Sequence, residues 1–97
     1  MMIVEEILLA AWPVLEAILT PDELERTHLD VVTAKGEPVT SSTIVSEDLL
    51  LRVFVFDEKM GFWLYPPEST DGFTARLRSE FQDFVAESGF GWGELRG

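Results

Sequence analysis

The chain has 97 residues, no cysteine, and a net charge of −11 from 18 acidic and 7 basic residues. Its length fits one domain with a modest core, and a hydrophobic fraction of 46% argues against disorder. The lack of cysteine excludes disulfides, thiolate metal sites and thiol catalysis within this chain. The charge argues against binding to nucleic acid or to anionic membranes.

Residues 3–19 carry apolar side chains at helical spacing, with Glu5, Leu9, Trp12 and Glu16 on the opposite side. We expect an amphipathic helix that Pro13 either kinks or divides into two short helices. The stretch has no basic residue and is too short and too charged to span a bilayer, which predicts neither a secretion signal nor a membrane anchor. We therefore expect a cytoplasmic protein.

A second helix begins at Thr20. Threonine can cap a helix, Pro21 suits the first helical position, and Glu23 completes a capping box. This helix is expected to be short and to end near Arg26–Thr27.

Four strands are expected next, because β-prone runs alternate with turn signals. Residues 28–34 predict a first strand, residues 35–38 a turn, and residues 39–45 a polar edge strand. Two apolar runs, Leu49–Phe56 and Phe62–Tyr65, predict a central hairpin. Its turn is placed at 57–61, with Gly61 in the left-handed conformation.

The pairing register of this hairpin decides what its two faces look like. With Asp57 opposite Phe62, one face is aliphatic, and the other is aromatic with Arg52 beside it. The aromatic face is then either buried in a two-sided core or left open by helices that cover only the aliphatic face. The aliphatic face holds Leu49, Leu51, Val53, Val55 and Leu64, and the aromatic face holds Phe54, Phe56, Trp63 and Tyr65.

The last helix is predicted to run from Thr70 or Asp71 to Ser88, where Gly89 stops it. Residues 90–97 form a tail of aromatic residues between glycines, which we expect either to pack over the sheet or to engage a partner. The whole order predicts a two-layer α+β sandwich. In it, the N-terminal and C-terminal helices cover one face of an antiparallel meander of about four strands.

The sequence does not predict an enzyme. His28 and Asp30 could begin a non-haem iron site, but such a site needs a second histidine and the chain has only one. Ser41 and Ser42 lack the context of a catalytic serine. The glycines of residues 89–93 follow a helix, whereas a phosphate loop precedes one. We expect no catalytic residue, no metal and no cofactor.

Two function classes remain. The first is a small acidic binding module that recognises and blocks a basic protein, as an immunity protein, an inhibitor or a DNA mimic does. The second is an accessory subunit without catalytic activity that self-associates and buries its aromatic face in a homodimer. The candidate partner-binding residues are Glu5, Trp12, Glu16, Arg52, Phe54, Phe56, Trp63, Tyr65 and Trp92.

Overall fold

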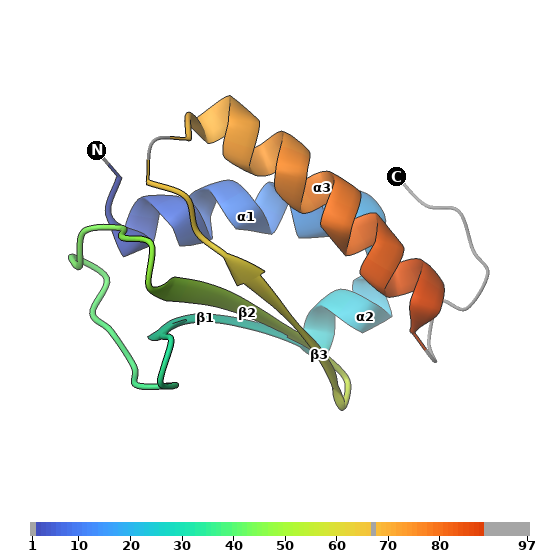
Figure 1. The fold of residues 1–97 in the computed structure, drawn as a ribbon. Coiled ribbons are helices and arrows are strands. Elements are labelled where there is room, and N and C mark those ends of the chain that lie inside the picture. Colours follow the sequence, from blue (N-terminus) through green and yellow to red (C-terminus); the bar gives the residue numbers. More distant parts are fainter. Residues whose placement is uncertain (1, 67, 89–97) are drawn as a thin grey trace.

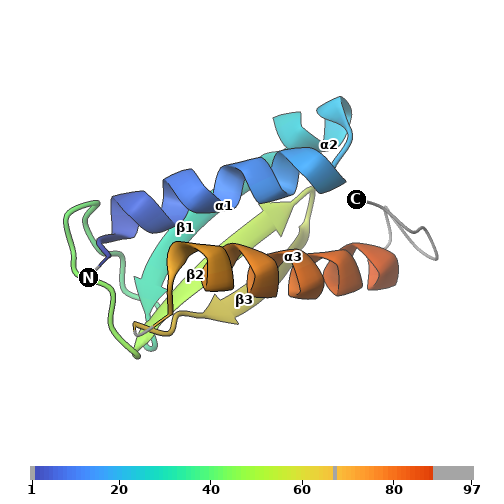
Figure 2. The same ribbon diagram turned by 90° about the horizontal axis from the view of Figure 1, so that it is seen from above.

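Two α-helices lie side by side on one face of a three-stranded antiparallel sheet in the computed structural model (Figures 1 and 2). The structure describes residues 2–66 and 68–88. The expected α+β meander, with its N-terminal and C-terminal helices on one face, is confirmed. The elements are α1 (Val4–Ile18), α2 (Pro21–Glu25), β1 (Thr27–Thr33), β2 (Leu49–Val55), β3 (Glu58–Trp63) and α3 (Thr70–Glu87).

Helix α2 begins at the predicted cap Thr20, and α3 begins after Ser69, which caps it. Helix α1 runs unbroken through Pro13, whose side is exposed. In α2 the Thr20 hydroxyl accepts from the Glu23 amide at 3.3 Å, and the Glu23 carboxylate accepts from the Thr20 amide at 2.9 Å. The Ser69 hydroxyl accepts from an amide of the first turn of α3 at 3.1 Å. These caps satisfy amides that have no partner within a helix.

The register predicted for the hairpin is wrong. Its turn consists of Phe56 and Asp57, so that Phe54 lies opposite Lys59, six residues before the expected Tyr65. Phe56 takes the left-handed conformation, with φ at 55°, that the sequence analysis reserved for glycine. Gly61 lies instead inside β3, opposite Arg52.

The two faces of the hairpin nevertheless match the prediction. Side chains alternate along a strand with a period of two, so a register shift by an even number of residues returns each one to the same face. The predicted aliphatic face is the buried one, and it also holds Phe62. Glu58 and Met60 share this face and are half-buried. Its buried members, all at most 3% exposed, are Leu49, Leu51, Val53, Val55, Phe62 and Leu64.

Residues 39–45, predicted as an edge strand, form no strand. One isolated bridge involves this region, between Ile44 and Ile3, and another just before it joins Pro38 to Val32. Its carbonyls instead accept from the first amides of α1, which have no partner within the helix. Three bonds of 2.9 Å hold the two segments together: Val4 to Thr43, Glu5 to Ser41, and Val45 to Met2, with the amide named first.

The core lies between the helices and the sheet. Arg76 fixes α3 against β3, because its guanidinium lies 4.1 Å from the ring centre of Phe62 and donates to the Trp63 carbonyl at 3.1 Å. It also donates to both carboxylate oxygens of Glu68, at 2.7 and 2.9 Å, and this raises its pKa. The helices contribute to the core Val4, Ile7, Ala11, Val14, Leu15 and Ile18 from α1, and Phe73, Leu77, Phe81 and Val85 from α3.

Candidate functional site

The sheet face turned away from the helices, called the outer face below, carries exposed aromatic side chains. No described helix covers it (Figure 1). Trp63 is 53% exposed, Tyr65 57% and Phe56 47%. Within the described chain the aromatic face is therefore open, and the core is one-sided. The outer face comprises His28, Asp30, Val32, Leu50, Arg52, Phe54, Phe56, Lys59, Gly61, Trp63 and Tyr65.

An ion pair and an aromatic pair cross the outer face. Arg52 donates to both carboxylate oxygens of Asp30, at 2.7 and 2.6 Å. These hydrogen bonds lower the pKa of Asp30 and raise the pKa of Arg52. The Arg52 guanidinium lies 5.2 Å from the ring centre of Phe54, which in turn lies 5.9 Å from the ring of His28. The side chains at this end of the face therefore hold one another in place.

A second surface lies on the solvent side of α1. We call it the acidic stripe, and it consists of Glu5, Leu9, Pro13 and Glu16, all exposed. Leu9 is 69% exposed, more than any other large hydrophobic residue described. Trp12 does not stand outward as its helical position predicted. It is half-buried and packs against the core.

Charge is distributed unevenly between the two layers. The three strands have no net charge, because Asp30 and Glu58 are balanced by Arg52 and Lys59. The three helices carry a net charge of −8, from ten carboxylates against Arg76 and Arg78, and both arginines belong to α3. The carboxylates are Glu5, Glu6, Glu16, Asp22, Glu23, Glu25, Asp71, Glu80, Asp83 and Glu87.

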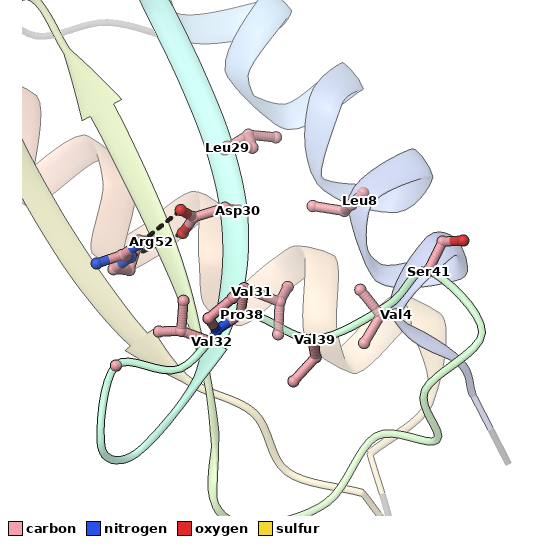
Figure 3. A pocket seen from close by; sticks show the side chains of 11 residues that line it. Val4, Leu8, Leu29, Asp30, Val31, Val32, Pro38, Val39, Ser41 and Arg52 are labelled. Atoms are coloured by element: carbon pink, nitrogen blue, oxygen red, sulfur yellow. Dashed lines mark hydrogen bonds and ion pairs between the residues drawn. The ribbon is translucent and has the colours of Figure 1, made fainter.

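A groove of about 360 Å³ follows the free edge of β1 (Figure 3). Its walls are mostly apolar, with Leu8 of α1 on one side and Leu29 of β1 on the other. Its one carboxylate belongs to Asp30, which Arg52 already holds. Among the residues that the structure describes, no three His, Asp or Glu side chains gather to hold a metal. No described helix is long and apolar enough to cross a bilayer.

The structure divides the predicted binding residues between opposite layers. Three of them belong to α1, namely Glu5, Trp12 and Glu16. Five belong to the outer face: Arg52, Phe54, Phe56, Trp63 and Tyr65. Trp92 and the predicted tail lie outside the described residues.

Sequence reasoning missed two residues that complete the outer face, Lys59 and Gly61. It placed Leu9 on the same helical side as Glu5 and Glu16, but it did not count Leu9 among the binding residues. Lys59 and Gly61 were not recognised as residues of the outer face because the predicted turn included both of them.

Comparison with known protein families, curated proteins and solved structures gives no match for this chain. The two surfaces are therefore what the chain itself offers for a functional interpretation.

Proposed function

We propose that this chain is a small acidic binding module, without catalytic activity, that recognises and blocks a basic protein through the acidic stripe of α1. The observation that carries the proposal is the separation of charge between the layers. Helices α1 and α2 hold six carboxylates and no basic residue. A field of one sign accelerates the encounter with an oppositely charged protein and orients it toward that layer.

The exposed Leu9 supplies what charge alone lacks. Exposed carboxylates give fast association but little net affinity, because water screens them. A leucine between Glu5 and Glu16 gives an apolar contact for the aliphatic part of lysine or arginine side chains, whose charged ends then reach the glutamates. This combination fits an inhibitor or an immunity-type protein, and it fits a DNA mimic whose carboxylates replace phosphates.

We keep the cytoplasm as the expected compartment, since the chain has no cysteine that an oxidising compartment could use for disulfides. The stripe is directed at protein rather than nucleic acid, because carboxylates repel phosphates.

The proposal is tested by reversing charge on the stripe. The wild-type protein captures partners from an extract of its source cells, and each captured protein is purified and its binding rates are remeasured. We expect a basic protein whose association rate falls as salt rises tenfold. The double variant Glu5→Lys/Glu16→Lys should slow association about tenfold or more, and Leu9→Ala should speed dissociation.

The matched control is Glu37→Lys/Asp48→Lys, which makes the same charge change at two exposed loop positions off the stripe. It should slow association less than the stripe variant does. A partner that binds the stripe variant as fast as the wild type, or whose association rate ignores salt, would rule the proposal out.

A further inference from the structure

The outer edge of β3 has backbone groups that point away from the sheet. The Leu64 amide donates to the Leu49 carbonyl of the β2 side at 3.1 Å. Amides alternate in direction along a strand, so those of Lys59, Gly61 and Trp63 point outward. Arg76 reaches the Trp63 carbonyl. The described residues place no strand and no other backbone hydrogen bond along this edge.

The two edges of the sheet differ in how they are protected. At the β1 edge, the Thr33 amide is already bonded to the Glu37 carbonyl at 2.9 Å, and Pro38 forms a bridge to Val32. That edge also lies beside α1, which has no basic residue. The β3 edge lies on the side of α3, whose two arginines reduce its net charge to −2 (Figure 2). The β3 edge is therefore the more accessible edge and the less acidic one.

We infer that β3 is a self-association surface, where a second copy of this chain adds its own β3 antiparallel across a two-fold axis at Gly61. Edge strands with free amides and carbonyls pair readily with another strand. The inference is independent of the basic partner proposed above, because it uses the sheet and leaves the acidic stripe open.

The positions of the outward groups select this register. A two-fold axis at Gly61 pairs Gly61 with itself and Lys59 with Trp63 of the second copy, so all three outward amides donate across the axis. The Trp63 carbonyl, which already accepts from Arg76, accepts the bond from the second copy with its other lone pair. A two-fold axis at Lys59 would place the two Lys59 side chains of the dimer directly opposite each other, and like charges repel. A two-fold axis at Trp63 would leave Lys59 and Gly61 without partners in the strand of the second copy.

The side chains of the outer face suit the same register. Lys59 meets the indole of Trp63 from the second copy, where an ammonium over an aromatic ring is attractive. At Gly61 the Leu50 side chain lies over the backbone, with a methyl carbon 3.3 Å from where a Cβ atom would be, and it gives the two indoles an apolar surface beside the axis. In each copy, β3 carries one acidic and one basic residue, Glu58 and Lys59, and the three strands together have no net charge. The two copies therefore meet where the electrostatic repulsion between them is weakest.

A charge-swap pair tests the register. Trp63→Lys sets a lysine opposite Lys59 of the second copy, twice in each dimer, and should weaken the dimer about tenfold or more. Adding Lys59→Glu converts both contacts into opposite charges and should restore the dimer. The matched control is Ile44→Lys, which also replaces an exposed apolar residue by lysine but in the loop beside the start of α1, and it should dimerise as the wild type does. Sedimentation equilibrium measures each dissociation constant, and circular dichroism confirms that each variant is folded.

Amide exchange supplies an independent measurement on the unmodified protein. The Gly61 and Lys59 amides should exchange slowly at a concentration where the dimer dominates and quickly after dilution. A wild type that remains monomeric up to millimolar concentration overturns the inference. So does a Trp63→Lys variant that dimerises normally, or a double variant that is no better than the single one.

Discussion

The guanidinium of Arg52 and the carboxylate of Asp30 meet side on across β1 and β2, joined by two parallel hydrogen bonds of 2.7 and 2.6 Å. The two residues are also direct partners in the strand register. A bidentate pair in this position favours one alignment of the strands, because a slip would separate the charges.

The Asp30–Arg52 pair makes stability depend on pH in the acid range. The pKa of Asp30 is lowered from 3.8 by folding, chiefly through its hydrogen bonds with Arg52 and to a smaller extent through the nearby charges of Arg52 and His28. Its stabilising effect is thus present above the unfolded pKa and is lost as pH falls through the folded pKa. We expect Asp30→Asn to lower the melting temperature near pH 6 and to match the wild type more closely below about pH 4. A difference that stays constant from pH 2 to pH 7 would contradict this.

Arg76 is expected to resist replacement by lysine. Its flat guanidinium serves Glu68, the Trp63 carbonyl and the ring of Phe62 together, which an ammonium cannot do. Arg76→Lys should lower the free energy of unfolding by about 1 kcal/mol in urea denaturation. Arg78→Lys, on the exposed side of the same helix, is the matched control and should change it by less than about 0.5 kcal/mol. Equal effects would show that the shared geometry contributes nothing.

The hairpin turn stores backbone strain at Phe56. A residue with a Cβ atom at φ 55° costs about 1 kcal/mol or more relative to glycine. We expect Phe56→Gly to be more stable than Phe56→Ala by about 1 kcal/mol in chemical denaturation. Both variants lack the ring, so their difference isolates the backbone. If Phe56→Ala is the more stable, the turn does not hold this conformation in solution.

The one-sided core separates the aromatic residues into two energetic classes. Phe81 is fully buried between the helices and the sheet, and Phe81→Ala should lower the free energy of unfolding by ~3–5 kcal/mol. Trp63 is 53% exposed. Trp63→Ala should therefore lower the free energy of unfolding by less than about 1 kcal/mol, measured under conditions where the protein is monomeric. Comparable losses at the two positions would mean that the outer face is covered.

The helices were predictable from sequence because their signals are local. Capping by Thr20 depends on Glu23, only three positions away, and the apolar spacing of α1 depends on its neighbours alone. Residues 39–45 could not be assigned in the same way. Their polar, β-prone pattern is consistent with a strand, but the groups that satisfy them belong to the start of α1, some forty residues earlier.

The sequence predicted which face of the sheet the aromatic residues occupy, but not which residues lie beside them. The reason is that side chains alternate between the two faces of a strand. The turn was misplaced because Gly61 was taken as the residue with positive φ, when Phe56 holds that role. The even shift kept Phe54, Trp63 and Tyr65 on their predicted face but concealed which residues neighbour them. Lys59 and Gly61, the residues on which the proposed dimer depends, became visible only with the true register.

The loop that bonds to the start of α1 also sets an order of events during synthesis. The first turn of α1 relies on the carbonyls of Ser41 and Thr43, so it frays until the ribosome has released that loop. The apolar side of α1 is covered completely only later, because Phe81 and Val85 of α3 lie more than sixty residues beyond α1 in the chain. The nascent chain therefore exposes part of this apolar side until α3 has been made, and the two helices reach their native packing only then.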